Sequence, residues 1–554
     1  MLPSTHTPTA QHDSSSSQLL SEHQIKERNV LFIGNITQDT VITYSESISN
    51  NSSTLQPLSE NGNHYNNNQQ NQFVIDNSRY EQVKSQSLGG SVMFGCLAFQ
   101  HYMKDTTTTP SHHLHHRESP TNTNKRSSSP LSSHLGYDHH GGWNINHTQP
   151  LSSLFQPRIF TKIGKRDVRK LLRFFESRLD DEHHHQEHHC PSNISIMNDT
   201  SYIHAEDEGL LDVNTPQHVQ KEQPDLCVVK KLRGLKMFEN IVVVDHHPHE
   251  DEQGEMPMEE SSKLTQYELC YPPPLENGMP NQRTLSCLDR GSIFHHDDIQ
   301  HILENQQLRQ GHLEALFFVP VAAEFDHHFV KHFSEKVMHH YCHSPMIICT
   351  DIQGYLRKIE SGGKVSHNSF EYLQQVLSVL STVVSIIKLD HEEAKKCIEN
   401  SENLSPEACA LILQEQYGFP IVNVTMGGGG SVCASKGSEI TFHSKMAKLK
   451  EEQATSQPQS SKVKYFPAFK PKRVRDETGA GDTFLSCFVA ELLLTKHSKF
   501  ANHDKLDSFT LTYDEIFECV KMASSSTSFR VEERGLNGFA SRRQAYQRVC
   551  ENQD

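Results

Sequence analysis

The segment RDETGAGDTF, residues 475–484, combines residue types that can hold an anion and accept a proton. Gly479, Ala480 and Gly481 leave the backbone bare, Asp482 follows at once, and an apolar helical pattern begins at Phe484. The first N–H groups of a helix have no intrahelical partner and carry partial positive charge, so a glycine turn there can bind a phosphate. A carboxylate repels a phosphate, so Asp482 is better suited to take a proton from an incoming hydroxyl. The segment therefore predicts an anion hole at residues 479–481 and a general base at Asp482.

The plainer interpretation of the same segment is a tight turn that caps a helix. An isolated G-A-G-D has that structural origin more often than a chemical one. The chain contains no G-x-x-x-x-G-K-[ST] sequence, so the turn is not a P-loop. Further site-like residues at the ends of neighbouring strands would favour the chemical interpretation.

The elements that must position the turn are an alternation of apolar strands and helices. Helices are expected over 91–103, directly after Gly89 and Gly90, and over 169–179. Strands are expected over 29–36, 158–164, 239–247, 315–321, 345–352, 383–389 and 420–427. This alternation predicts a parallel sheet with helices on both faces, in which ligands bind at the carboxyl ends of the strands. Glycines and acids gather at those predicted ends: Gly34, Asp39, Asp351, Asp390, Glu393 and Gly427–Gly430.

The composition limits how much of the chain can form that core. Only 35% of the 554 residues are apolar, so polar segments must alternate with well-packed ones. A polar tail, residues 1–28, and five polar or histidine-rich insertions cannot bury enough apolar surface to offset the entropy of ordering. The insertions are expected at about 45–72, 104–154, 180–224, 248–284 and 445–462. The remainder suits one large domain within residues 29–550 better than several domains.

The charge and the cysteines exclude some classes of partner. A net charge of −16 disfavours nucleic acid or an anionic membrane surface. The sequence contains no run of 18 apolar residues, so no membrane span is expected. The first 20 residues have no apolar signal core. The 13 cysteines show no paired spacing, so reduced thiols and a cytoplasmic or nuclear location are expected.

Six segments together resemble the PfkB family of ribokinase-like carbohydrate kinases. DETGAGDTF resembles the family's carboxy-terminal signature, VLFIGNITQD its first strand, and LGGSVMFGCLA its di-glycine turn. KLDHEEA resembles its K-P-N-x-x-E-A segment, VNVTMGGGGSV its T-x-G-x-x-G turn, and PMIICTDIQGYLR a D-x-Q-G-x-L-R strand. The segments occur in the family's order, which makes the set far more specific than any one motif. The tail 519–535 also resembles the family's last nucleotide-side helix.

The resemblance implies an α/β fold, a ribokinase-like three-layer α/β/α domain with a mostly parallel sheet and a small β lid. It implies transfer of the γ-phosphate of ATP, with Mg²⁺, to a hydroxyl of a sugar, an inositol-like polyol or a nucleoside. On the matching positions, the substrate would meet Asp39, Gly89 and Gly90, and the nucleotide would meet Thr425, Gly427 and Gly430. Asp390 and Glu393 would organise Mg²⁺ through water, and Asp482 would be the catalytic base behind the anion hole of Gly479, Ala480 and Gly481.

Three positions depart from the family pattern. Glu477 replaces the usual Thr, and Asp390 replaces an Asn, although Asp can still hold hydrated Mg²⁺. Phe94 stands where the ribose-specific branch has Asn, which argues against a ribokinase activity. The overall pattern is most similar to the branch that contains plant inositol 3-kinase. The sequence leaves the substrate open.

Other features of the chain allow further interpretations. IVVVDHHPHED resembles the metal strand of the DHH phosphoesterases, but the early strand before Asp39 offers a single acid. The tracts HHLHH and HHHQEHHC bind metals adventitiously at most, because no ordered Cys or His spacing surrounds them. A catalytically silent PfkB-like scaffold with polar interaction arms is the main rival from another class. Exposed lid edges also make a homodimer through the lid plausible.

Overall fold

The computed structural model describes the parts of the chain that carry the predicted elements. These are residues 28–46, 80–104, 155–164, 167, 171, 240–244, 264–272, 284–304, 312–340, 345–444, 461–500 and 506–552. The tail 1–27, both histidine tracts, residues 245–247 and nearly all of the predicted helix 169–179 lie outside the described residues. The predicted insertions lie mostly outside them too, so their role stays a prediction.

A nine-stranded sheet forms the centre of the molecule, in the order β16-β14-β13-β12-β9-β8-β1-β4-β5. Its strands are β1 (Arg28–Ile33), β4 (Phe155–Gly164), β5 (Asn240–Val244), β8 (His312–Phe318), β9 (Ile347–Asp351), β12 (Ile386–Asp390), β13 (Ile421–Thr425), β14 (Ser431–Ser435) and β16 (Lys462–Phe466). All neighbours from β5 to β13 pair in parallel, and only β14 and β16 add antiparallel pairs at one edge. The prediction of a mostly parallel α/β sheet is therefore confirmed. Every predicted strand forms, although the first ends at Ile33 rather than at residue 36.

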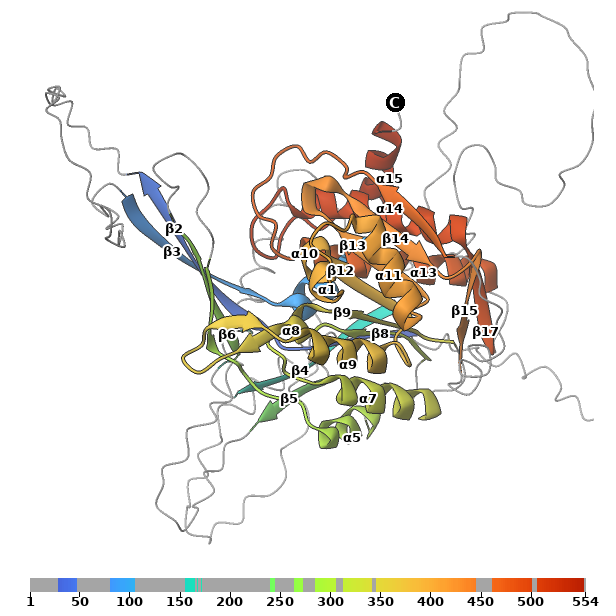
Figure 1. The fold of residues 1–554 in the computed structure, drawn as a ribbon, viewed down its shortest axis with the longest axis horizontal. Helices are drawn as coiled ribbons and strands as arrows, with labels where there is room; N and C mark the ends of the chain where they lie inside the picture. The colour runs from blue at the N-terminus through green and yellow to red at the C-terminus, as the bar shows by residue number, and fades with distance from the viewer. Residues whose placement is uncertain are drawn as a thin grey trace, which may run out of the picture.

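Helices cover both faces of this sheet, because the side chains of each buried strand alternate between two apolar cores. In β1, for example, Phe32 points to one core and Leu31 to the other. The first core holds α1 (Ser91–Lys104), α13 (Ala480–Phe500), α14 (Tyr513–Arg530) and α15 (Arg542–Glu551). The second core holds α5 (His296–Glu304), α7 (His327–His340), α8 (Gln353–Leu356), α9 (Phe370–Leu380), α10 (His391–Lys396) and α11 (Pro406–Tyr417). In Figure 1, α13 and α14 lie above β8 and β9, and α5, α7 and α9 lie below them.

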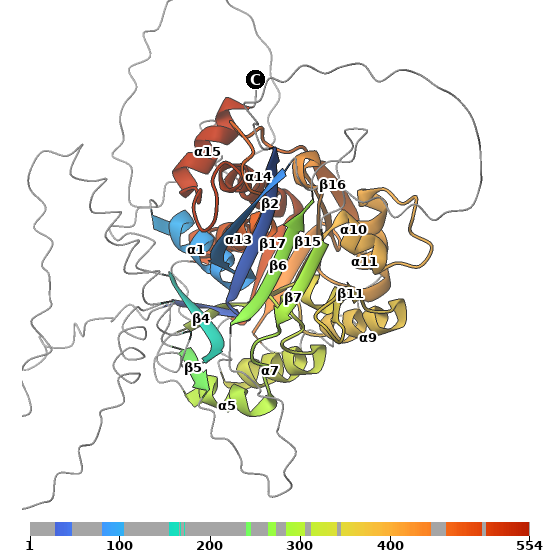
Figure 2. The same ribbon diagram turned by 90° about the vertical axis from the view of Figure 1, so that its left-hand side faces the viewer.

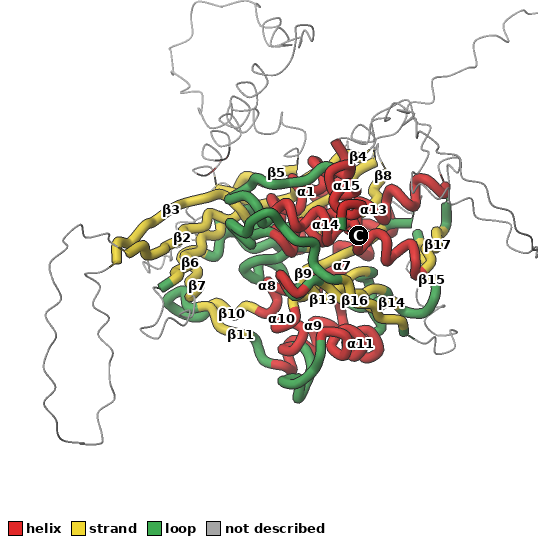
Figure 3. Tube along the Cα trace, turned by 90° about the horizontal axis from the view of Figure 1, so that it is seen from above, coloured by secondary structure: helices red, strands yellow, loops and turns green. Residues whose placement is uncertain are grey.

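A separate four-stranded sheet projects from this body, in the order β3-β2-β6-β7 (Figures 1 and 2). Its strands are β2 (Thr37–Glu46), β3 (Tyr80–Gly89), β6 (Thr265–Tyr271) and β7 (Thr284–Asp289). The hairpin of β10 (Arg357–Ile359) and β11 (Val365–His367) lies beside β7, and a bridge between Ser286 and Lys364 joins the two (Figure 3). This sheet is the predicted small β lid.

The prediction of polar insertions from composition was wrong for parts of the lid. All of β6 and the end of β2 fall in ranges for which polar insertions were predicted. The polar residues of a half-exposed antiparallel strand resemble those of a loop, so composition alone does not separate the two. Two further strands, β15 (Glu439–His443) and β17 (Ser508–Thr512), pair at the other end of the molecule. None of the helices in the described ranges has the length and apolar run that a bilayer crossing requires.

Candidate active site

The glycine turn, Gly479–Asp482, lies where a loop enters the long buried helix α13. Gly479 has φ +76°, a left-handed conformation that glycine adopts without strain, and its carbonyl accepts hydrogen bonds from both N and Oγ1 of Thr483 at 2.9 and 2.8 Å. The Ala480 amide donates to the carbonyl of Glu477 at 3.1 Å in this structure, and a role for Ala480 in the anion hole stays a prediction. Among the described residues, the amides of Gly479, Gly481 and Asp482 donate to no such backbone carbonyl outside the helix. They are therefore the donors of the turn that remain available to an anion.

Asp482 lies in the first turn of α13 and is half-buried. Burial raises the pKa of its carboxyl to about 6, and the nearby Asp351 adds to that rise. Lys388, a hydrogen bond with Ser91 and the guanidinium of Arg357 act in the opposite direction. A carboxylate with a pKa of about 6 is ionised at neutral pH and still basic enough to accept a proton in a reaction.

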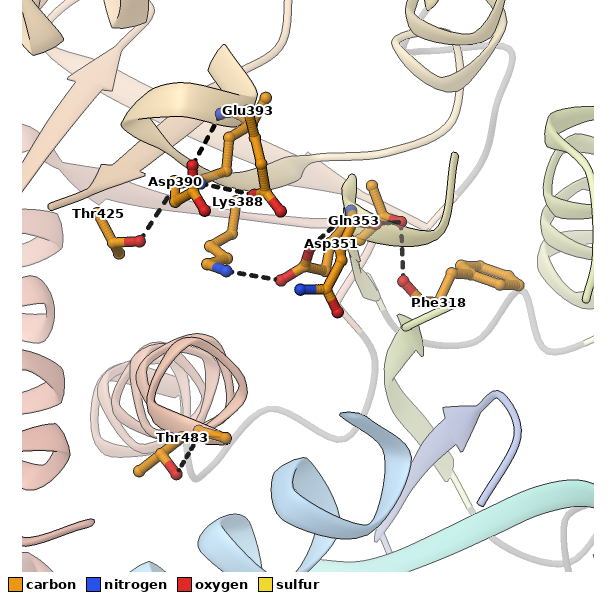
Figure 4. A network of polar contacts seen from close by, with 11 residues as sticks. Phe318, Asp351, Gln353, Lys388, Asp390, Glu393, Thr425 and Thr483 are labelled. Carbon is orange, nitrogen blue, oxygen red and sulfur yellow. Dashed lines mark hydrogen bonds and ion pairs between the residues drawn. The ribbon is translucent and has the colours of Figure 1, made fainter. Parts of the chain in front are cut away.

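Lys388 is a buried cation of the site, and the sequence did not predict a role for it. Its Nζ donates to Asp351 Oδ2 at 2.8 Å, and both side chains are buried (Figure 4). Burial by itself lowers the pKa of Lys388, but Asp351, Glu393 and Asp482 raise it above its usual value, so it stays charged. A Cβ at Gly481 would lie 2.4 Å from Nζ, which places the ammonium against the glycine turn.

The signal for Lys388 was present in the strand pattern. Ile386 faces the core that contains α13, and side chains two residues apart on a strand share a face. Lys388 therefore points to the start of α13, as a charged residue at the carboxyl end of β12. Asp351 was noted among the acids at strand ends, and its ion pair with Lys388 appears only when β9 and β12 pair.

Asp390 and Glu393 form a capping box at the start of α10. Asp390 Oδ1 accepts from the amide of Glu393, and Glu393 Oε2 accepts from the amide of Asp390, both at 2.7 Å. Burial raises the pKa of Glu393 to about 7, although Lys388 opposes that rise. Asp390 is exposed, so its second carboxylate oxygen faces solvent.

These carboxylates fit Mg²⁺, which prefers oxygen ligands and is commonly held by one or two carboxylates, phosphates and water. Within the described ranges, no three His, Cys, Asp or Glu side chains converge on a common point as a ready-made metal site. The donor set therefore suits a hydrated ion beside a bound phosphate rather than a cage made of protein alone.

Asp39, Gly89 and Gly90 meet where the lid joins the body. Asp39 lies on β2, and a Cβ at Gly89 would be 3.0 Å from its Oδ2. The carbonyl of Gly90 accepts from the amides of Met93 and Phe94, which starts α1. Burial raises the pKa of Asp39 to about 6, while Thr37 and Arg357 lower it.

Arg357 links the lid carboxylate to the body carboxylate. Its Nη1 donates to the carbonyl of Val321 at 2.9 Å, and its guanidinium lies 5.2 Å from the ring centroid of Tyr267 on β6. Its charge acts on both Asp39 and Asp482. The two acids, far apart in the sequence, therefore line one site. The segment 345–357 suggested the strand but not this function for its arginine.

Thr425, Gly427 and Gly430 lie at the end of β13 and in the loop after it, next to Asp390 at the end of β12. Thr425 is the register partner of Asp390 between β12 and β13, and its Oγ1 donates to the carbonyl of Leu389 at 3.3 Å (Figure 4). Gly427 to Gly429 form an exposed 3-10 turn, closed by a hydrogen bond from the Met426 amide to the Gly430 carbonyl at 2.8 Å. An exposed glycine loop beside the acids is open to a large ligand. Its contact with a nucleotide stays a prediction.

Glu477, the unusual residue of the motif, is exposed. Its carbonyl holds the Ala480 amide, and that role is independent of the side chain. The turn therefore tolerates Glu where the motif usually has Thr.

Part of the chain matches one protein-family model. Residues 361–539 match the model of the pfkB family of carbohydrate kinases. The comparison with curated proteins gave no match. The matched segment contains Lys388, Asp390, Glu393, the loop at 427–430 and the glycine turn, whereas Asp39 lies before it.

Similar solved structures include three kinases. Ribokinase from Giardia lamblia is 10% identical, covers 95% of this chain and 99% of its own, and has a TM-score of 0.46. Fructokinase from Xylella fastidiosa, with bound ATP, has the same identity and coverage and a TM-score of 0.44. A pyrophosphate-dependent kinase in the ribokinase family, complexed with myo-inositol, is 13% identical over 94% of this chain and 99% of its own, with a TM-score of 0.42. Residues 361–539 are therefore similar to the pfkB family of carbohydrate kinases.

Proposed function

We propose that this chain is an ATP-dependent kinase that transfers the γ-phosphate to a hydroxyl of a sugar, an inositol-like polyol or a nucleoside. The proposal depends on one observation above all. A carboxylate with a pKa of about 6, Asp482, stands at a helix start whose Gly481 and Asp482 amides are available, beside the charged Lys388. Phosphoryl transfer requires a base, donors for phosphate oxygens and a cation, and this is that combination.

The reaction needs little covalent work from the protein. Asp482 takes the proton of the acceptor hydroxyl as that oxygen bonds to the γ-phosphorus, and the bond from phosphorus to the β-phosphate oxygen breaks to release ADP. The amides of Gly481 and Asp482 and the ammonium of Lys388 stabilise the charge on the transferring phosphoryl group. Asp351 keeps Lys388 in place through their 2.8 Å ion pair.

The other predicted residues complete the binding sites. Asp39 and Arg357 hold acceptor hydroxyls as hydrogen-bond acceptor and donor, and the loop at Gly427–Gly430 holds the nucleotide. Asp390 and Glu393 hold hydrated Mg²⁺, which neutralises charge on the phosphates when bound.

Neighbouring charges argue for a neutral acceptor rather than an anionic one. Asp39 and Asp482 both carry negative charge at neutral pH, and Arg357 is the cation that acts on both. A neutral polyol or sugar meets no net repulsion there. The inositol 3-kinase branch, a homodimer through the lid and a cytoplasmic location stay predictions.

The direct test is ADP release by the full chain with ATP and Mg²⁺ across a panel of sugars, polyols and nucleosides, with mass spectrometry of the product. Asp482→Asn is expected to lower kcat by about 10²–10⁴-fold while nucleotide binding persists. Asp514→Asn is a matched control, because Asp514 is an exposed acid in the first turn of α14. Normal activity in Asp482→Asn would refute the mechanism, and no phosphorylated product on any acceptor would favour a silent scaffold.

A further inference from the structure

Arg530, the last residue of α14, is fully buried directly behind the glycine turn. Its Nη2 donates to Asp476 Oδ2 at 3.3 Å, and its Nη1 donates to the carbonyl of Glu533 at 2.6 Å. The guanidinium lies 5.0 Å from the ring centroid of Phe94, within cation–π range. Among the described residues, Nε has no hydrogen-bond partner. A buried charge with an incomplete set of partners is costly, so its presence needs a reason.

Asp476 connects that guanidinium to the backbone of the turn. Its Oδ1 accepts from the amide of Thr478 at 2.9 Å, and its Oδ2 also accepts from the amide of Gly535 at 3.1 Å. The amides of Arg475 and Asp476 both donate to the carbonyl of Val531. Residues 475–478, which lead into the glycine turn, are therefore held by hydrogen bonds to the segment that follows α14.

Phe94 connects the same guanidinium to the acceptor side. A Cβ at Gly479 would lie 2.2 Å from Cδ1 of Phe94, so the ring lies directly against the turn. A Cβ at Gly89 would lie 3.1 Å from the ring and 3.0 Å from Asp39 Oδ2. The ring therefore fills the space between the glycine turn and the carboxylate of the lid.

We infer that Arg530 and Phe94 form a positioning pair that sets the glycine turn relative to Asp39, and with it the gap between acceptor hydroxyl and transferred phosphate. The inference rests on the proposed kinase function. Neither side chain is assigned a contact with the reacting atoms. Phosphoryl transfer depends on alignment, and a displacement of about 1 Å can lower a rate by about 100-fold. The pair acts on kcat because it fixes distance rather than binding either substrate.

Arg530→Lys keeps the positive charge but removes the planar guanidinium. Only the guanidinium can donate to Asp476 and Glu533 at once while it lies over the ring of Phe94. Its kcat is expected to fall by about 10–100-fold, with KM for ATP and for the acceptor within a few-fold of wild type. Arg530→Ala should regain part of the lost kcat when guanidinium ion is added, whereas sodium at the same ionic strength should not restore it. Phe94→Leu should lower kcat in the same way, and the double variant Arg530→Lys/Phe94→Leu should lose less than the product of the single losses.

Arg542→Lys is the matched control. Arg542 is a partly buried arginine that pairs with Glu491 at 2.6 Å between α15 and α13, and Glu491 lies more than two turns beyond Asp482 along α13. It should lower Tm without changing kcat. If Arg530→Lys does not fold, Phe94→Leu carries the test through the same separation of kcat from KM.

Two results would overturn the inference: unchanged kcat in folded Arg530→Lys and Phe94→Leu, or strictly multiplicative losses without guanidinium rescue. The proposed function is tested separately, because Asp482→Asn must be inactive even where the positioning pair proves unimportant. A fully active Asp482→Asn would remove both claims.

Discussion

The ammonium of Lys388 donates to Asp351 at 2.8 Å where β9 and β12 run side by side, and the same ammonium stands against Gly481 of the glycine turn. Glu393 and Asp482 also act on it, so three carboxylates share one buried cation. This excess of negative charge, together with burial, raises the pKa of both Asp482 and Glu393. Carboxyl groups with raised pKa values can accept a proton near neutral pH.

The pH dependence of kcat should reflect the charges around Asp482. Wild-type kcat is expected to fall as pH drops through about 6, because Asp482 must be ionised to act as a base. Lys388 lowers the pKa of Asp482 and Asp351 raises it. In Lys388→Met the acid limb should therefore move to higher pH, and in Asp351→Asn to lower pH. Stopped assays from pH 5 to 8 measure the limbs, and a shift in the same direction for both variants would contradict this electrostatic assignment.

The free energy of unfolding should show how much burial of the Asp482 carboxylate destabilises the folded protein. The folded pKa of Asp482, about 6, lies above its unfolded value of 3.8, so the folded state binds this proton more tightly. That stabilising contribution is present below pH 3.8 and is lost as pH rises through about 6, which leaves the ionised folded state with a penalty. Asp482→Asn should therefore be more stable than wild type at pH 7 by about 1–3 kcal/mol. The difference should shrink toward pH 4, as measured by urea unfolding, and a less stable Asn variant at pH 7 would contradict it.

The two glycines of the turn should fail in different ways. Gly481→Ala brings a Cβ to 2.4 Å from the flexible end of Lys388, so the chain should fold while Lys388 is displaced and kcat falls by at least about 10-fold. Gly479→Ala meets the ring of Phe94 at 2.2 Å and a φ of +76°, so it should also lower Tm. Gly418→Ala has a similar φ, +81°, in open space and controls for backbone strain alone. Equal losses of Tm in Gly479→Ala and Gly418→Ala would show that the Phe94 contact is unimportant.

Two substitutions of Asp390 should distinguish its role as a helix cap from its predicted role in Mg²⁺ binding. Asp390→Ala removes the N-cap of α10 and should cost about 1 kcal/mol, and it should also raise the Mg²⁺ concentration needed for half-maximal activity. Asp390→Asn keeps a good N-cap, so stability should return while the Mg²⁺ requirement stays intermediate. Urea unfolding and Mg²⁺ titration of ADP release give the two readouts. An unchanged Mg²⁺ requirement in Asp390→Ala would exclude this residue from the metal site.

Much of the body could be predicted from the sequence, because buried parallel strands are short apolar runs that punctuate the chain visibly. The strand ends also carried their own evidence: Asp390, Glu393 and Gly427 all follow apolar runs. The lid was harder, because β6 reads TQYELCY within a polar stretch and its partner β2 is distant in sequence. Half-exposed strands lack the continuous apolar run by which buried strands are identified.

The sequence by itself determined the family motifs, the parallel sheet and the candidate base at Asp482, because each depends on local pattern: periodicity, a glycine turn and a carboxylate at a helix start. Only the tertiary structure decided that Lys388 pairs with Asp351, that Arg357 acts on Asp39 and Asp482 together, and that the Ala480 amide is already occupied. It also brought Arg530 against Phe94 from opposite ends of the chain. These relationships follow from strand order and helix packing, which bring distant segments into contact, and charge acts through space rather than along the chain.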